Sequence, residues 1–235
     1  MPDFSKRSED LEIMDDLQCA GEVVDQTLRE LEIINIYLGG NKVTINGITK
    51  LLKNTNTTKE FTIIDVGCGG GDTLRLIDRW AKRKKKKIKL VGIDANPNII
   101  SFAKNNLRDL PHIEFLAIDI FSLKFQSIKC DILIGTLFFH HFSQQQLSSF
   151  FIGIKNQVRI GVVINDIHRH SLAYYSIKLL TKFFSQSEMV KFDAPLSVLR
   201  AFKKNELKEM LSTAGIEKYT ILWHWAFRWQ VLIRA

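Results

Sequence analysis

The 235-residue chain lacks most of the features that mark disulfide-rich, zinc-binding or membrane-spanning proteins. It has only three cysteines, Cys19, Cys68 and Cys130, which lie far apart and form no Cys-x-x-Cys pair. Neither a disulfide scaffold nor a cysteine zinc site is therefore supported. No apolar run reaches the ~18 residues of a membrane span, and residues 1–10 lack an apolar signal region. We expect a cytoplasmic protein without an integral membrane segment.

Positive charge is scarce outside one short segment. The net charge is +8, but seven cations lie between residues 82 and 89, and the rest of the chain carries only about +1. Proteins that bind nucleic acid usually spread their cations over a docking face. This run follows a predicted helix, whose negative end favours cations. We therefore expect a solvated helix end and no nucleic-acid partner, although attachment to an anionic surface stays open.

Glycines are concentrated after one apolar run. Residues 61–72 read FTIIDVGCGGGD, so that an apolar run ends in Asp65. Three glycines follow at alternate positions: Gly67, Gly69 and Gly71. A second apolar run, residues 90–93, ends in Asp94, whose carboxylate can accept both hydroxyls of a ribose. A strand, a glycine turn, a helix and a strand with a terminal acid predict a nucleoside-binding half-site.

The spacing of the glycines distinguishes between nucleotide ligands. Dinucleotide enzymes use Gly-x-Gly-x-x-Gly, but here Gly71 follows Gly69 after one residue, and no Gly-Lys-Ser/Thr follows the loop. An acid beside the loop, Asp65, repels a pyrophosphate and suits a cationic ligand. S-adenosylmethionine carries an ammonium and a sulfonium but no phosphate, so the loop favours that cofactor over NAD. A glycine-rich surface turn would explain the loop alone, but it would not explain the register of Asp94.

At these motifs the sequence resembles the class I S-adenosylmethionine-dependent methyltransferases, over about residues 60–166. The segment 65–71 is similar to the first motif of the family, and Asp94 to its ribose-binding acid. Residues 113–119 resemble the third strand, and residues 130–136 the fourth strand, whose end faces the methyl group. The resemblance implies the following cofactor-binding residues: Asp65, Gly67, Cys68, Gly69, Gly71, Asp94, Ala95, Asp119 beside the adenine amino group, Ile120 against the adenine ring, and Thr136.

The order of the remaining elements predicts an α/β fold with a doubly wound, mostly parallel sheet. Apolar patterns predict later strands over 158–165, 217–226 and 228–234, and helices over 8–16, 22–38, 42–53, 97–107, 143–155 and 206–214. The resemblance implies a Rossmann-like sheet of seven strands with an antiparallel last strand. We expect an N-terminal helical lid over residues 1–58, ending in a polar linker at 54–58, and a methyltransferase domain over residues 59–235.

An insertion of about forty residues separates the predicted fifth strand from the next helix of the domain. This segment, about 167–202, contains an apolar helical run over 172–184. It should lie beside the carboxyl ends of the strands, where ligands bind. We interpret it as a cap over the acceptor pocket, and its aromatic side chains favour an apolar or aromatic acceptor. An extra core helix and a membrane-surface helix remain alternatives.

Four histidines follow the two strands that should face the transferred methyl group. Methyl transfer from a sulfonium needs mainly positioning, but an oxygen acceptor must also lose a proton, a task that suits histidine. His140 and His141 follow the fourth strand, and His168 and His170 follow the fifth. These four side chains are the candidate catalytic residues. For the first pair, a structural role in capping the next helix and shaping the pocket stays open.

Two further patterns limit the chemistry. Metal-dependent catechol-type methyltransferases carry an acid after the fourth strand and Asp-Asn at the fifth; here the segments are 135–136, Gly-Thr, and 165–166, Asn-Asp, so we expect no metal. Near the end of the chain four aromatic residues alternate: Trp223, Trp225, Phe227 and Trp229. That alternation predicts one face of a strand pair, packed into the core against a helix, with a wall of the substrate pocket as the alternative.

The sequence thus predicts a methyltransferase that acts on a small, lipophilic or phenolic acceptor, by O-methylation. The stretch 168–198 also resembles bacterial methyltransferases that modify phenolic or polyketide-like metabolites. Two alternatives stay open: methylation of RNA or protein, and a non-catalytic module that binds the cofactor. The signature of base-amino methylation, Asn/Asp-Pro-Pro-Tyr, is absent. Neither the acceptor nor the oligomeric state follows from the sequence.

Overall fold

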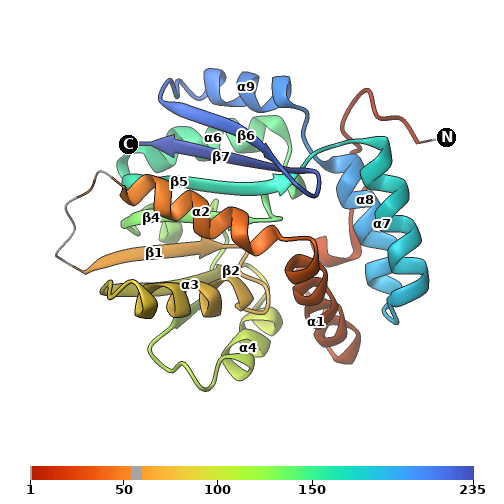
Figure 1. Ribbon diagram of the computed structural model, residues 1–235, viewed down its shortest axis with the longest axis horizontal. Helices are drawn as coiled ribbons and strands as arrows, with labels where there is room; N and C mark the ends of the chain where they lie inside the picture. Colours follow the sequence, from red (N-terminus) through yellow and green to blue (C-terminus); the bar gives the residue numbers. More distant parts are fainter. Residues whose placement is uncertain (1, 54, 56–59) are drawn as a thin grey trace.

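The fold is a seven-stranded sheet enclosed by helices, seen in a computed structural model that describes residues 2–53, 55 and 60–235 (Figure 1). The strand order is β3-β2-β1-β4-β5-β7-β6, and β7 runs antiparallel to both of its neighbours. The strands are β1 (Phe61–Val66), β2 (Ile88–Asp94), β3 (Glu114–Ala117), β4 (Cys130–Thr136), β5 (Val158–Ile167), β6 (Tyr219–His224) and β7 (Arg228–Arg234). The predicted fold class is confirmed.

Helices cover both faces of this sheet (Figure 1). The α-helices are α1 (Glu22–Tyr37), α2 (Gly40–Leu52), α3 (Asp72–Arg83), α4 (Pro97–Asn106), α5 (Leu123–Gln126), α6 (Gln144–Gly153), α7 (Ser171–Phe184), α8 (Glu188–Arg200) and α9 (Lys204–Thr213). Three short 3-10 turns are η1 (Ile13–Asp15), η2 (Phe139–His141) and η3 (Ile154–Asn156). One core contains α2, α3 and α4, and the other contains α5, α6 and α9.

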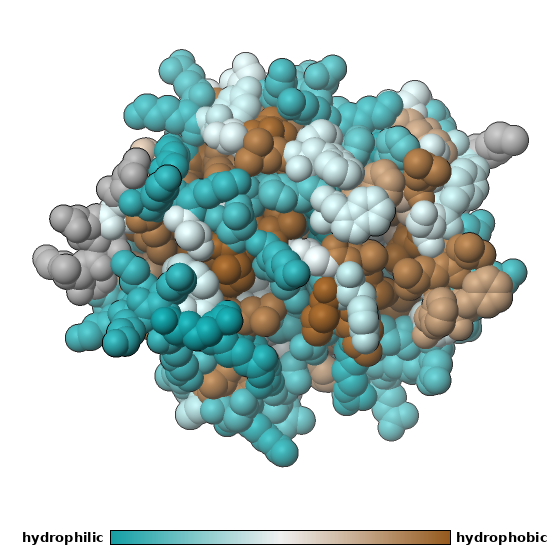
Figure 2. Space-filling view, in the orientation of Figure 1, coloured by the Kyte–Doolittle hydropathy of each residue, from teal (hydrophilic) through white to brown (hydrophobic). Residues whose placement is uncertain are grey.

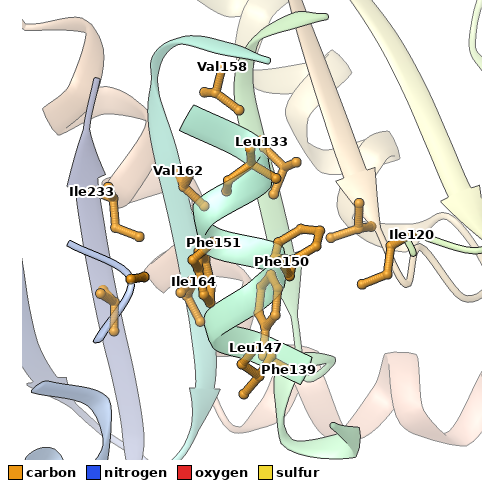
Figure 3. Close-up of a cluster of buried hydrophobic side chains, with 14 of the residues drawn as sticks. Ile120, Leu133, Phe139, Leu147, Phe150, Phe151, Val158, Val162, Ile164 and Ile233 are labelled. Atoms are coloured by element: carbon orange, nitrogen blue, oxygen red, sulfur yellow. The ribbon is translucent and has the colours of Figure 1, made fainter. Parts of the chain in front are cut away.

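The pleat of the strands explains why there are two cores. Ile63 and Ile64 are neighbours on β1, yet their side chains enter opposite cores, because successive residues of a strand point to opposite faces. On one face, α6 packs its apolar stripe, Leu147, Phe150 and Phe151, against β4 and β5 (Figure 3). Such burial of large apolar side chains stabilises the fold by roughly 1.5–3 kcal/mol per residue.

Two segments, residues 8–21 before α1 and the α7–α8 insertion, meet at the carboxyl ends of the parallel strands (Figure 1). Asp193 on α8 accepts hydrogen bonds from the backbone N–H groups of Ile13 (2.8 Å) and Met14 (3.1 Å). Glu30 on α1 accepts from the N–H groups of Gln186 (3.0 Å) and Ser187 (3.2 Å), between α7 and α8. These bonds join residues 8–21, α1 and the insertion into one cap. That the cap covers the acceptor pocket stays a prediction.

The N-terminal prediction needs two corrections. Residues 8–16 form no α-helix: only the turn Ile13–Asp15 is helical, and the side chain of Asp193 takes up its first N–H groups. Helix α2 is not part of a lid. It belongs to the core that also contains α3 and α4, because Ile48 and Leu51 are fully buried against the sheet. The predicted domain boundary at 58/59 stays a prediction. Most of the predicted linker 54–58 lies outside the described residues.

The prediction that the aromatic residues near the C-terminus share one face of a strand pair in the core holds only in part: Trp223 of β6 lies opposite Trp229 of β7. The turn between β6 and β7 occupies residues 225–227, so the alternation does not continue along one strand face. Trp229 is buried, and its indole N–H donates to the carbonyl of Phe202 at 3.0 Å. Trp223 and Trp225 are 48% and 71% exposed, so they are not core residues.

The outer face of α7 is apolar and exposed. Its exposed residues are Leu172, Tyr175, Leu179, Phe183 and Phe184. Figure 2 shows the resulting brown patch at the right of the molecule, where α7 lies in Figure 1. Within the part of the chain that the structure describes, no helix combines the length and apolar character needed to cross a membrane.

Candidate active site

A cavity of about 710 Å³ opens at the carboxyl ends of β1, β2, β4 and β5, beneath the cap. Its floor is built from the turns that leave these strands, and its roof comes from α1, α7, α8 and the segment before α1. A volume of this size suits a small-molecule ligand. Ligands of doubly wound folds bind at this edge of the sheet, where the strand order reverses on either side of β1.

The glycine turn forms one wall of the cavity. Gly67 has a positive φ of +65°, and a Cβ atom there would lie 2.0 Å from the ring of Phe138, so no other residue fits. Gly71 has a φ of +80° and precedes α3, where a Cβ atom would lie 3.1 Å from Leu107. Gly71 does not line the cavity. Its predicted role as a cofactor contact is therefore corrected to one in turning and packing the chain.

The other predicted cofactor residues all line the cavity: Asp65, Gly67, Cys68, Gly69, Asp94, Ala95, Asp119, Ile120 and Thr136. The carboxylate of Asp119 accepts a hydrogen bond from the N–H of Phe121 at 2.9 Å, which fixes the turn after β3. The hydroxyl of Thr136 lies 2.9 Å from that of Thr44 on α2. The residues predicted from the sequence therefore lie together on one wall of the cavity, and their contact with the cofactor stays a prediction.

Three carboxylates converge beside the glycine turn: Asp65 is buried, and Asp72 and Asp94 are half-buried. Burial, together with the charges of Asp72 and Asp94, raises the pKa of Asp65 well above its ordinary value. Burial and the charge of Glu32 raise the pKa of Asp72 to about 6. One oxygen each of Asp65 and Asp72 has no hydrogen-bond partner among the described residues. Buried, unpartnered carboxylates favour a cationic ligand.

Asp94 is better satisfied than the other two acids. Its carboxylate accepts hydrogen bonds from the N–H groups of Asn96 (3.0 Å) and Gly69 (3.4 Å), so it also ties the glycine turn to β2. Asp72 was missed as a site residue. It is the first residue of α3, where an acid is expected for the helix dipole alone, and only the fold shows that it faces the cavity.

His140 lies at the other side of the cavity and is paired with a carboxylate, as a histidine base would be. Its side chain is 2% exposed, and Nδ1 lies 2.6 Å from Oδ1 of Asp166 at the end of β5. The other carboxylate oxygen of Asp166 accepts the N–H of His140 at 3.1 Å. Burial opposes the ionisation of Asp166, but His140 holds the pKa of this carboxyl below its ordinary value. Nε2 of His140 has no hydrogen-bond partner among the described residues.

His141 is paired with Asp15 in the same way as His140 with Asp166. Its Nδ1 lies 2.6 Å from Oδ1 of Asp15, and the carbonyl of His141 accepts from Arg200 at 2.7 Å. The two imidazole rings are stacked, with their centroids 4.4 Å apart. Neither ring caps α6, since Ser143 caps that helix by accepting the N–H of Gln146. Both histidines line the cavity, as the sequence predicted.

Glu12 faces both histidines from the segment before α1. Its carboxylate oxygens lie 3.7 Å from Nε2 of His140 and 4.0 Å from Nε2 of His141, and burial raises its pKa to about 7. One ligand atom from each of these three residues lies within 4.8 Å of the others, a grouping that could hold a metal ion. Arg200 lies 3.7 Å from the same carboxylate, and its charge opposes a dication there. The expected absence of a metal stays a prediction.

His168 and His170 do not line the cavity, which corrects the expectation that both strand ends present histidines to the acceptor. The N–H of His168 donates to the carbonyl of Phe227 at 2.8 Å, and its ring packs against Trp229 with centroids 4.7 Å apart. Nδ1 of His170 accepts the N–H of Leu172 at 3.1 Å and so caps α7, while its ring stacks on Phe227. These two histidines hold the insertion against the hairpin.

Comparison with known proteins agrees with this geometry. The model of a family described as a methyltransferase domain matches residues 63–161. No curated protein matches the sequence. The plantazolicin methyltransferase BpumL, solved with S-adenosylhomocysteine, is 15% identical, with a TM-score of 0.64 over 91% of this chain and 99% of that chain.

Two larger proteins contain a similar fold. Human N-acetylserotonin methyltransferase, solved with S-adenosylmethionine, is 16% identical, with a TM-score of 0.61 over 90% of this chain and 55% of that chain. The CurJ carbon methyltransferase is 15% identical, with a TM-score of 0.59 over 82% of this chain and 54% of that chain. The chain therefore spans about half the length of these two proteins. Residues 63–161 thus match a methyltransferase domain, and the chain shares its fold with methyltransferases solved with S-adenosylmethionine or S-adenosylhomocysteine.

Proposed function

We propose that this methyltransferase O-methylates a small, lipophilic or phenolic acceptor. The observation that carries the proposal is the pairing of two groups in one cavity. Unpartnered carboxylates lie at one side, and His140, held by Asp166, lies at the other. The first group suits a cationic methyl donor, and the second suits an acceptor hydroxyl that must lose a proton.

The residues around the glycine turn fit S-adenosylmethionine. Asp65 and Asp72 have free, buried oxygens for a cationic group of the cofactor, and Asp94 lies at the end of β2, where it would hold the ribose. Ile120 and Asp119, after β3, would hold the adenine. When bound, the cofactor supplies the methyl group and its own leaving group, so the main task of the chain is to position the acceptor.

His140 would accept the proton of the acceptor. In a histidine–carboxylate pair, a carboxylate at Nδ1 fixes the tautomer and stabilises the imidazolium that forms. Asp166 occupies that position, at 2.6 Å, which leaves the lone pair of Nε2 for the acceptor hydroxyl. Glu12, 3.7 Å from Nε2, would further stabilise the positive charge. His141, held in the same way by Asp15, is the second candidate base.

The cap supports a small, apolar acceptor. The cavity wall on this side is formed by apolar side chains of α7 and α8 and by the turn of the terminal hairpin: Ala173, Ile177, Leu180, Val190, Val198, Trp225 and Phe227. Apolar, enclosed pockets recognise small lipophilic molecules. A nucleic-acid strand would instead require an open, positively charged groove. These features favour a metabolite over RNA or protein as the acceptor.

The test is transfer of radiolabelled methyl groups from S-adenosylmethionine to a panel of phenols that includes 2-naphthol. We expect His140→Ala to lower kcat by about 10²–10⁴-fold, the usual contribution of a general base, with little change in the affinity for S-adenosylhomocysteine. His168→Ala and His112→Ala, whose side chains lie outside the cavity, should stay within about twofold of the wild type. A rate that falls with His168→Ala but not with His140→Ala or His141→Ala would contradict the assignment.

A further inference from the structure

Arg228 is a buried cation that the proposed chemistry does not use. Its residue is 3% exposed at the start of β7, yet it lines the cavity. Nη2 donates to Oδ1 of Asn35 at 2.7 Å, but Nη1 has no hydrogen-bond partner among the described residues. A buried guanidinium without an anion is costly. Such a group is usually satisfied by a ligand where it borders a binding pocket.

The guanidinium is held firmly in place. Arg228 pairs with Ile167 of β5 and His224 of β6, so its backbone belongs to the sheet. Asn35, near the end of α1, fixes one side of the guanidinium. At the same contact the backbone approaches closely, because a Cβ atom on Gly40 would lie 2.5 Å from Oδ1 of Asn35 and 2.9 Å from the Cζ atom of Arg228. A fixed fork of N–H donors is suited to recognition of a planar anion.

Arg228 lies on the acceptor side of the cavity. In the strand order, β7 is separated from β4 by β5, and it lies on the side of β4 opposite to β1 and β2, where the cofactor acids lie. Adjacent strands are about 4.8 Å apart, so Arg228 is roughly two strand widths beyond the end of β4. Asp166, the group that holds His140, directly precedes Ile167, the residue of β5 that pairs with Arg228. Arg228 and the partner of the proposed base therefore both lie at the end of β5.

The surroundings of Arg228 are apolar and aromatic. Trp225, Ala226 and Phe227 precede it in the chain and also line the cavity. The cavity that Arg228 lines is thus also lined by aromatic side chains and by the apolar residues of the cap. A ligand that fits this place combines a flat, apolar body with one anionic group. A single guanidinium near several carboxylates suits a monoanion better than a phosphate dianion.

We propose that Arg228 binds a carboxylate of the methyl acceptor, so that the acceptor is a lipophilic hydroxy acid. The inference rests on the proposed function, and it adds the substrate class: the carboxylate lies at Arg228 while the reacting hydroxyl lies near His140. The methionine part of the cofactor also carries a carboxylate, and the experiment separates these two sources.

The test is calorimetric titration of the S-adenosylhomocysteine-saturated protein with 2-naphthoate and with neutral 2-naphthalenemethanol. The two probes share the ring system and differ in the charge of one substituent. We expect the wild type to bind 2-naphthoate at least tenfold more tightly, and Arg228→Met to lose this preference while its affinity for S-adenosylhomocysteine stays within about twofold. The matched control is Arg159→Met, which removes an exposed arginine that pairs with Asp131 outside the cavity.

Three results would overturn the inference: equal binding of both probes by the wild type, a preference that persists in Arg228→Met, or a loss of S-adenosylhomocysteine affinity in that variant with the preference retained. The last result would assign Arg228 to the cofactor. If Arg228→Met does not fold, by near-ultraviolet circular dichroism, Arg228→Gln provides the same test with a polar side chain. If the wild type does not bind S-adenosylhomocysteine, the proposed function fails, and the same titrations without it still test the acid site.

Discussion

At the scale of single residues, the cavity combines buried charges of both signs that lack partners in the protein. Asp65 and Asp72 each leave one oxygen without a hydrogen bond, and Arg228 leaves one nitrogen, among the described residues. Unpartnered buried charge lowers stability. Because natural proteins tolerate such costs mainly at functional sites, these atoms indicate where ligands bind, and the sign of each indicates the charge of its ligand.

The stability of the ligand-free protein should therefore depend on the protonation of Asp72. Its pKa is raised to about 6 by burial and by Glu32, above the ordinary value of 3.8. The folded state then binds more protons than the unfolded state between about pH 4 and 6, so stability falls as the pH rises through this window. Asparagine cannot ionise, so the free energy of unfolding of Asp72→Asn should not fall in this pH window. We expect the variant to exceed the wild type by about 2–3 kcal/mol at pH 8, and by much less at pH 4.

Urea unfolding of both proteins at pH 4, 6 and 8, without cofactor, measures this difference. Asp109→Asn provides the control, since Asp109 is an exposed partner of Arg75 and surface pairs contribute little. A difference that is the same at every pH would mean that Asp72 keeps an ordinary pKa, and the electrostatic account of the cofactor wall would then be wrong.

Residue identity alone located the cavity wall at the glycine turn better than the side that carries His140 and His141. The glycine turn and Asp94 are close in sequence, and each is required by a local geometry that few other residues satisfy. The two histidines after β4 find their partners in two distant segments: Asp166 at the end of β5 pairs with His140, and Glu12 and Asp15 before α1 face His140 and His141. His168 and His170 follow β5 directly, yet the bond from His168 to Phe227 keeps the chain in the sheet, and their rings pack outside the cavity. Such pairings cannot be deduced from spacing.

At the scale of elements, the cap depends on side chains that bind backbone groups of another segment. Asp193 on α8 holds η1 through two N–H groups, and η1 carries Asp15 against His141. Arg7 donates to the carbonyls of His140 (2.7 Å) and Phe142 (2.9 Å). The amphipathic pattern that predicted a helix over residues 8–16 could not show that these long-range bonds would replace the helical ones.

Removal of the Asp193 carboxylate should release the segment before α1. We expect Asp193→Ala to increase the rate of tryptic cleavage after Lys6 or Arg7 about tenfold, because two part-buried N–H groups lose their acceptor, and each loss costs at most about 1–3 kcal/mol. The KM for the acceptor should rise, because the roof over the acceptor side is loosened, while the affinity for S-adenosylhomocysteine should change less. Glu188→Ala, on the exposed face of the same helix, is the control.

An unchanged cleavage rate for Asp193→Ala would show that other contacts, such as those of Arg7, hold this segment alone. A loss of cofactor affinity as large as the rise in the acceptor KM would show that the cap serves the cofactor rather than the acceptor. Either result would remove the structural basis for assigning the segment to the acceptor pocket.

At the scale of the whole molecule, the lysine-rich segment and the cavity lie at opposite ends of the sheet. Helix α3 begins beside the glycine turn and runs back along β1, so residues 84–87 follow its far end (Figure 1). Lys84, Lys85 and Lys87 are exposed. A nucleic acid bound to these lysines would be on the far side of the protein from the methyl donor, which argues against a nucleic-acid acceptor.

Replacement of Lys84, Lys85, Lys86 and Lys87 by glutamine should therefore leave methyl transfer to a small acceptor within about twofold of the wild type. These charges are separated from the cavity by the length of the sheet. Exposed charges are largely screened beyond one Debye length, about 8 Å at physiological salt, so their effect on the cavity should be weak. Rates measured at 20 mM and 150 mM salt, for wild type and variant, provide the comparison. RNA that is methylated by the wild type, with a rate that falls steeply with salt and is lost in the variant, would contradict the metabolite assignment, because phosphate contacts produce that dependence.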